Sequence, residues 1–204
     1  MPQRTPRVAK PRLPRTAGKR AGVSREALIR QAANLADREG LAAVTLARLA
    51  ALSDIRTPTV SHHVGSLRQV RADLAVLAVE ELTEAVREAA SGRQGSDAVR
   101  SMYRAYRVFV HAHSGRYAAS IEAPDPKDAR RLAAAGRLAA LLIDVFGQMG
   151  LQGDDALRAA RLLRAAVHGY ATLELSGAWQ TPLDGDDTFN WLLDVIISGL
   201  TTGA

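Results

Sequence analysis

A short segment of the sequence, 57–64, combines residue types that can read the edges of base pairs. Val60 and Val64 are spaced four residues apart, so on a helix they point to one side. The opposite face then carries small or hydrogen-bonding side chains and no carboxylate, namely Pro58, Thr59 and His62. A helix that enters the major groove of DNA needs such a face, because carboxylates would oppose the phosphates.

The residues around this segment add groups that bind phosphate or guanine. Arg56 directly precedes it, where a guanidinium fork can reach a guanine edge or a phosphate. Thr45 is predicted to begin the preceding helix, whose free N–H groups suit a phosphate oxygen. Ser61 and His63 flank the exposed face. The same spacing also fits a plain helical hairpin inside a bundle, so the pattern alone leaves both interpretations open.

Helical signals continue along the chain from Ser24 and predict an all-α fold. Ser24 suits the N-cap of a helix over 24–39. Thr57 is predicted to cap the helix that carries the exposed face, with Pro58 at its first position. A longer helix follows from Leu67, and further helices are predicted over 96–113, 127–149, 154–177 and 187–200. No segment shows the extended alternation of apolar and polar residues that is typical of a strand.

The composition excludes several kinds of site. The chain has 204 residues and no cysteine, which rules out a disulfide scaffold, a thiolate zinc site and a cysteine nucleophile. No apolar run approaches the roughly 20 residues of a membrane-spanning helix, and the N-terminal region lacks the apolar stretch of a secretory signal. We therefore expect a cytoplasmic protein without membrane contact.

Positive charge is concentrated at the start of the chain. Lys and Arg total 27 against 21 Asp and Glu, a net charge of +6. Residues 1–23 contain seven of the basic residues, four of the eight prolines and no acid. Such a segment buries too little apolar surface to order itself. We predict a disordered basic arm, which is either a solubilising tail or an arm that follows phosphates or enters a minor groove.

Several runs of residues match a known pattern. In the first third they are Ala32-Ala33, Gly40, Val44-Thr45-Leu46, Leu49-Ala50, Ile55, Thr57-Pro58-Thr59-Val60, His63-Val64 and Leu74. Through them the stretch Ser24–Glu81 resembles the N-terminal DNA-binding domain of the tetracycline-repressor (TetR) family of bacterial regulators. Later in the chain, Val167-His168-Gly169 is similar to the subgroup with a Trp-His-Gly signature, although Val167 stands in the place of Trp.

Three residues depart from the family's pattern. Ser61 stands where the family usually has Tyr, Asp54 where the turn commonly has Gly, and Leu67 where many members have Lys. Asp tolerates the left-handed conformation better than most residues, so we expect the turn to form. The other two replacements remove usual phosphate contacts. The candidates to replace them are Arg56, Arg68, Arg71 and the basic arm.

The predicted basic arm occupies 1–23, and the resemblance implies a three-helix helix-turn-helix domain at 24–70 and a helical effector-binding and dimerisation domain at 71–204. It implies a homodimeric transcriptional regulator, not an enzyme and without a cofactor. As a ligand-responsive repressor it would bind a palindromic operator in double-stranded DNA. The residues predicted to contact DNA are Thr45, Arg56, Thr57, Pro58, Thr59, Ser61, His62, His63 and Arg68.

The resemblance also implies a small apolar effector and a dimer interface in the C-terminal domain. The candidate pocket residues, each of which also suits core packing, are Met102, Tyr106, Phe109, Tyr117, Leu142, Phe146 and His168. The segment 187–200 is apolar around nearly its whole circumference, so we expect its own domain and a partner to bury it from two sides. The predicted interface residues are Leu163, Tyr170, Phe189, Trp191, Leu192, Val195 and Ile196.

Two alternatives come from other classes of protein. A helical metal-dependent enzyme is one, but His111 and His113 are two residues apart and would face away from each other on a helix. The sequence has no His-Glu-x-x-His motif, no glycine-rich phosphate loop and no nucleophile elbow. The other is a protein-interaction module whose basic tail binds acidic partners without base-pair preference.

Overall fold

The computed structural model describes residues 23–180 and 182–202, and every regular element in these ranges is helical, as predicted. The elements are α1 (Arg25–Glu39), the 3₁₀ helix η1 (Leu41–Ala43), α2 (Leu46–Leu52), α3 (Thr57–Val64), α4 (Leu67–Ala90), α5 (Gly95–Ala112), α6 (Ser114–Ile121), α7 (Ala129–Gly147), α8 (Gly153–Leu175) and α9 (Gly185–Thr202). The predicted basic arm lies outside the described residues except for Val23, which packs against the N-terminal core. None of the described helices has the length and hydropathy to cross a membrane.

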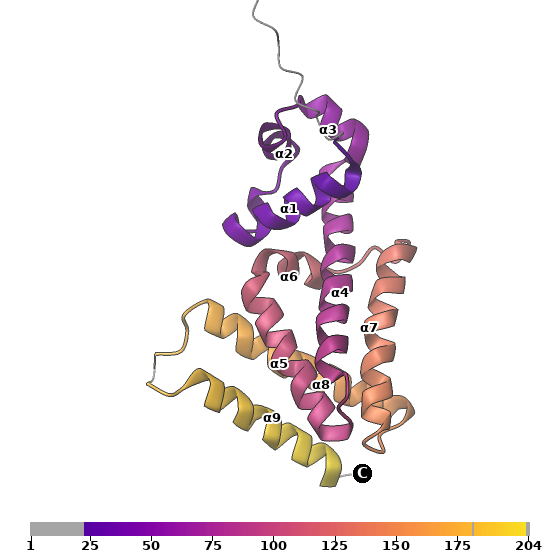
Figure 1. The fold of residues 1–204 in the computed structure, drawn as a ribbon, viewed down its shortest axis with the longest axis vertical. Helices are drawn as coiled ribbons and strands as arrows, with labels where there is room; N and C mark the ends of the chain where they lie inside the picture. Colours follow the sequence, from indigo (N-terminus) through magenta and orange to yellow (C-terminus); the bar gives the residue numbers. More distant parts are fainter. Residues whose placement is uncertain (1–22, 181, 203–204) are drawn as a thin grey trace, which may run out of the picture.

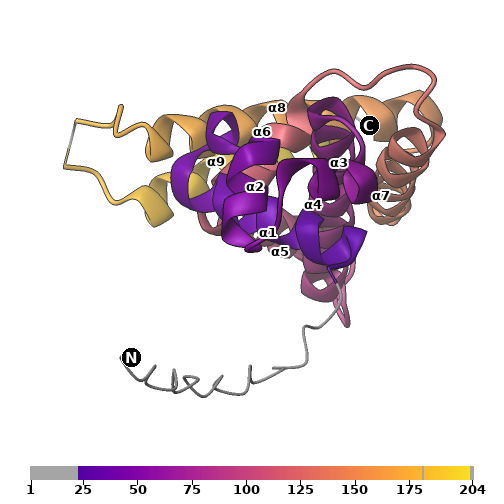
Figure 2. The same ribbon diagram turned by 90° about the horizontal axis from the view of Figure 1, so that it is seen from above.

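The helices form a small head on a larger body. Figure 1 shows α1, α2 and α3 together at one end of the molecule, while α5, α7, α8 and α9 lie toward the other. The long helix α4 begins in the head and runs down through the body, and α6 lies between the two groups. Seen from above, the end of α8 and the start of α9 extend beyond the head on one side (Figure 2).

Local signals set the ends of the first helices. The Ser24 hydroxyl accepts a hydrogen bond from the Ala27 amide at 3.1 Å, and the Thr45 hydroxyl accepts one from the Arg48 amide at 3.1 Å. Both residues are therefore N-caps, as predicted. The start of α3 differs by one position, because the Arg56 carbonyl accepts the Thr59 amide at 2.9 Å and so opens the helix.

The helix α4 begins at Leu67, as predicted. Gly65, with φ +75°, ends α3, whereas Ser66 is the N-cap of the next helix. The Ser66 hydroxyl accepts from the Gln69 amide, and the Gln69 side chain accepts from the Ser66 amide at 2.8 Å. This reciprocal capping box starts α4 immediately after α3.

The sequence did not predict α6 as a separate helix. The backbone breaks at His113 (φ −132°, ψ 46°) and resumes helical geometry at Ser114. Gly115 allows α6 to lie directly against α1, because a Cβ at this position would be 2.0 Å from the Ala36 carbonyl oxygen. Contact at that distance is impossible for any larger residue without a shift of one helix.

Two apolar cores meet on α4. The N-terminal core contains Leu28, Leu49, Val60 and Val64 and takes residues of α4 as far as Ala75. The C-terminal core begins at Val76 on the same helix and includes residues of α5 to α9. The domain division predicted at residue 70 thus falls within α4, a continuous helix that belongs to both cores.

Candidate DNA-binding surface and effector cavity

The helix-turn-helix is built from α2, the turn 53–56 and α3. Leu49, Val60 and Val64 have no exposed surface and fix the two helices against each other. Asp54 adopts φ +52°, the left-handed conformation expected at this turn. The Ile55 amide donates to the Ala50 carbonyl at 3.0 Å and closes the turn.

Packing of the two valines turns the predicted DNA-contacting face of α3 outward. Thr57, Pro58, Thr59 and His62 are exposed, as is Arg56 before them. Thr45, Ser61 and His63 are half-buried at the edge of this face. The cap at Thr45 uses only the acceptor function of its hydroxyl, so its proton remains available to a phosphate oxygen.

The surface around α3 is rich in arginine. Residues 45–71 contain four arginines and a single acid, Asp54. Three of the arginines contact acids of other segments: Arg48 with Glu39 at 2.9 Å, Arg68 with Asp125, and Arg71 with Glu122 at 4.0 Å. Arg56 makes no ion pair with any residue in the described part of the chain, so no neighbouring acid there neutralises its charge.

A buried carboxylate, which was not predicted from the sequence, connects the head to the body. Asp73 on α4 is only 8% exposed and accepts from Arg25 Nε of α1 and from Arg130 Nη1 of α7, each at 2.8 Å. Arg25 also donates to the His63 carbonyl near the end of α3 at 3.2 Å. Hydrogen bonds therefore run from the last turn of α3, through Arg25 and Asp73, to α7.

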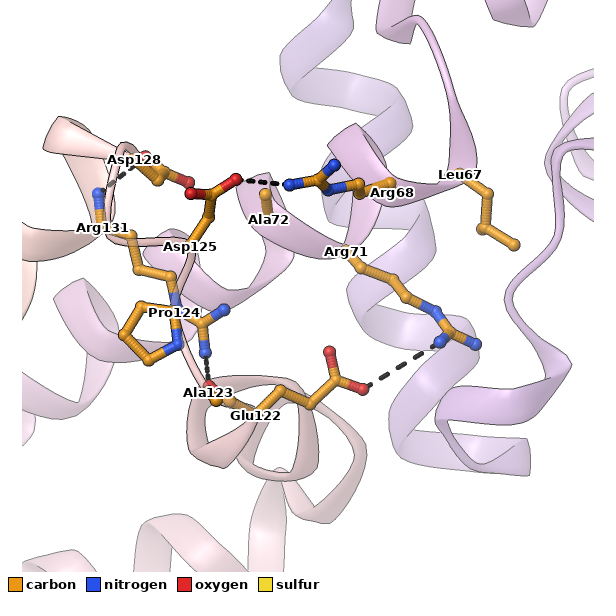
Figure 3. A pocket seen from close by; sticks show the side chains of 10 residues that line it. All are labelled: Leu67, Arg68, Arg71, Ala72, Glu122, Ala123, Pro124, Asp125, Asp128 and Arg131. Carbon is orange, nitrogen blue, oxygen red and sulfur yellow. Dashed lines mark hydrogen bonds and ion pairs between the residues drawn. The ribbon is translucent and has the colours of Figure 1, made fainter.

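A second connection lies in a hollow of about 500 Å³ between the start of α4 and the segment 122–131, here called the arginine hollow. Figure 3 shows Arg68 and Arg71 reaching from α4 toward Asp125 and Glu122. In the same hollow, Arg131 is 8% exposed and donates to carbonyls at the end of α6, including that of Ala119 at 3.3 Å. This hydrogen bonding holds the segment after α6 against α7.

A separate apolar cavity of about 280 Å³ lies in the body among α4, α5, α7 and α8. Of the predicted pocket residues, Tyr106 and Leu142 line it. Tyr117 and His168 line an adjoining hollow, here called the tyrosine–histidine hollow. Met102, Phe109 and Phe146 are packed in the C-terminal core and line neither space.

The predicted polar anchor His168 takes part in a short chain of hydrogen bonds. The Tyr117 hydroxyl lies 2.7 Å from His168 Nδ1 and 3.0 Å from the Tyr106 hydroxyl. Burial raises the pKa of Tyr117 well above its ordinary value. The phenol therefore stays protonated at neutral pH and can act as a hydrogen-bond donor.

The predicted dimer-interface residues fall into two groups. Leu163, Tyr170 and Phe189 lie in the protomer's own core, where they have little surface to offer a partner. Leu192 and Ile196 are partly buried against the same core. Trp191 and Val195, by contrast, are 68% and 52% exposed on α9, so one side of this helix packs inward and the other leaves large apolar groups uncovered.

The two histidines considered as metal ligands turn to different elements. His111 Nε2 lies 2.8 Å from Glu174 of α8, whereas His113 Nδ1 lies 3.2 Å from Asp37 of α1. Their spacing predicted this divergence. Both act as links between helices in the structure.

The fold and this surface define a helix-turn-helix protein with a larger helical body. Residues 99–196 match the family model for the tetracyclin repressor-like C-terminal domain. The chain is 32% identical over 181 residues to the uncharacterised HTH-type transcriptional regulator Rv0681 of Mycobacterium tuberculosis, covering 88% of this chain and 83% of that protein. It belongs to the TetR family of transcriptional regulators. It is therefore not an enzyme.

Solved structures show the same fold. A protein of unknown function from Rhodococcus sp. RHA1 matches with a TM-score of 0.77 at 21% identity, over 91% of this chain and 99% of that one. The TetR family protein ActR of Streptomyces coelicolor, in complex with (S)-DNPA, matches with a TM-score of 0.67 at 23% identity, over 90% and 100% of the two chains.

Proposed function

We propose that the protein is a ligand-responsive repressor that binds a palindromic operator as a homodimer in the cytoplasm. The observation that carries the proposal is the outward face of α3. It is free of acids, lies at the end of the head and is held rigidly by the buried Val60 and Val64. This is the geometry of a helix that enters a major groove.

Each exposed group on this face has a proposed role. Thr59 and His62 contact base edges, and Arg56 contacts a guanine or a phosphate. Thr57 and Pro58 form the first turn of α3, which approaches the groove most closely. Thr45, Ser61 and His63 contact phosphates at the edge of the face, and Arg68 contributes a further phosphate contact when it leaves Asp125.

The uncovered apolar side of α8 and α9 supports the homodimer. Trp191 and Val195 on α9 and Leu162 and Leu173 on α8 are all between 44% and 68% exposed. A palindromic site has two half-sites whose centres are about 34 Å apart, and each half-site needs its own copy of α3. A two-fold contact through this face would supply both copies. The Val167-His168-Gly169 run within α8 supports placement in the Trp-His-Gly subgroup.

The apolar cavity supports regulation by an effector, since the related ActR is a ligand-bound TetR protein. The end of α6 and the chain that follows it, residues 120–122 and 124, line this cavity, and residues 122–125 line the arginine hollow at the start of α4. A ligand that moves this segment changes the contacts of Arg68 and Arg71. The two α3 helices then lose the spacing that suits successive major grooves.

The decisive experiment selects bound sequences from a random duplex pool and compares variants on the selected site and on scrambled DNA. Thr59→Ala and His62→Ala should each weaken specific binding by about 1–3 kcal/mol, while binding to scrambled DNA changes less. Thr201→Ala, on the exposed end of α9, is the matched control. Equal losses on both DNAs, or no enriched sequence at all, contradict the proposal.

A further inference from the structure

The apolar cavity is not apolar at every point of its boundary. Arg161 and Arg164 of α8 line it, three residues apart and therefore on one side of the helix. Both are exposed. Neither side chain makes a hydrogen bond or an ion pair with any residue in 23–180 or 182–202. The third arginine of α8, Arg158, differs in this respect, because it pairs with Asp155 at 2.7 Å.

The two unpaired arginines lie where two spaces meet. Ile121, Arg161 and Arg164 line both the apolar cavity and the tyrosine–histidine hollow. On one side of this junction the walls are aliphatic, with Val79, Leu82, Leu138, Leu142 and Leu157. On the other side are the Tyr117 hydroxyl and the His168 imidazole. A molecule at the junction would therefore have one apolar and one polar environment.

The charges at the cavity favour one class of ligand. The cavity is lined by three arginines, including Arg131, and by one carboxylate, Glu122, which also faces Arg71. A neutral apolar ligand would cover Arg161 and Arg164 without pairing them, and removing unpaired cations from water is costly. A cationic ligand would be repelled. An anionic head group gains charge-assisted hydrogen bonds from both guanidinium groups.

We propose that the effector is an amphipathic anion whose apolar part fills the cavity and whose acidic head group binds Arg161 and Arg164. The inference rests on the proposed function for the existence of an effector, and it replaces the purely apolar ligand expected from the sequence. The volume of about 280 Å³ is at the lower end of ligand pockets. The ligand is therefore small, with one aliphatic or aromatic group and one carboxylate or similar acid.

The test measures binding of matched acids and alcohols to the full-length protein by isothermal titration calorimetry. The probes are octanoate with 1-octanol, and 2-naphthoate with 2-naphthol. At least one acid should bind about tenfold more tightly than its alcohol, as expected for hydrogen bonds to charged groups. Arg161→Gln/Arg164→Gln should abolish this preference and leave alcohol binding unchanged, while Arg158→Gln on the same helix should retain it.

Every outcome of these titrations either supports or contradicts the proposed head-group contact. The proposal is overturned if neither acid is preferred, if neither acid binds, or if the preference survives in the double variant. The single variants Arg161→Gln and Arg164→Gln, with helical content checked by circular dichroism, show that any loss reflects the head-group contact. DNA binding without ligand is measured separately. Intact operator binding without an acid preference refutes this inference alone, whereas an acid preference without operator binding refutes the proposed function alone.

Discussion

The ion pair between Arg68 and Asp125 creates a competition with DNA that Asp125→Asn should reveal. Arg68 is the second residue of α4 and follows α3 after the Gly65 turn, so it lies beside the reading face. In the structure its guanidinium is bound to Asp125 (Figure 3). To contact a phosphate, Arg68 must first leave this carboxylate.

The exposure of the pair limits the size of the effect. The Arg68 and Asp125 side chains are 81% and 38% exposed, and so exposed a pair contributes about 0–1 kcal/mol. A dimer breaks two such pairs on binding DNA. Asp125→Asn should therefore strengthen binding by up to about 2 kcal/mol, which corresponds to about 30-fold in Kd. Loss of a negative charge near the phosphates acts in the same direction.

Fluorescence anisotropy with selected and scrambled duplexes over a range of salt concentrations measures the effect. The tightening should be similar on both DNAs, because phosphates are common to all sequences. Arg68→Gln should reduce the salt slope by about 0.9 per protomer. Glu84→Gln is the control, since it also removes one negative charge but lies about 25 Å from Arg68 along α4. If Asp125→Asn behaves like Glu84→Gln, or tightens binding equally in an Arg68→Gln background, the competition does not exist.

Three further predictions concern stability and the connection between head and body. Leu49→Ala removes a fully buried side chain of the head and should cost about 2–5 kcal/mol in unfolding free energy, measured by urea denaturation; an unchanged midpoint would show that the site is not packed. Gly115→Ala places a Cβ against α1, so it should lower the melting temperature and weaken operator binding; normal values for both would contradict the close contact. The hydrogen bonds from Arg107, aided by His111, hold the pKa of Glu174 below its ordinary value of 4.5. This carboxylate therefore adds stability above about pH 4.5 that is lost as the pH falls through its lower folded pKa, and the stability difference between wild type and Glu174→Gln should shrink at low pH; a constant difference would refute the link.

The head of the molecule could be predicted from the sequence because its determinants are local. The caps at Ser24 and Thr45 act on amides three residues away, and the valine pair on α3 lies within one turn of a helix. Asp54 in the turn was also predictable, since few residues other than Gly adopt its backbone conformation. Such features are visible in a window of about 20 residues.

The links between head and body could not be predicted, because they join distant parts of the chain. Asp73 is 48 residues from Arg25 and 57 from Arg130, and in the sequence it resembles any exposed acid on a helix. The role of Gly115 depends on the nearness of Ala36 on another helix. The spacing of Arg161 and Arg164 places both on one side of a helix, and this could be predicted from the sequence. The aliphatic wall opposite them could not, because its residues come from several other helices.

Because α4 is one unbroken helix with residues in both cores, a tilt at one of its ends also moves the other end. Its 24 residues span about 36 Å at 1.5 Å per residue. A tilt of about 5° at the end beside the cavity would displace the opposite end by about 3 Å, close to the 3.4 Å rise between successive base pairs. A rotation too slight to disturb the packing of the body would thus carry the reading helix across roughly a full step of the duplex.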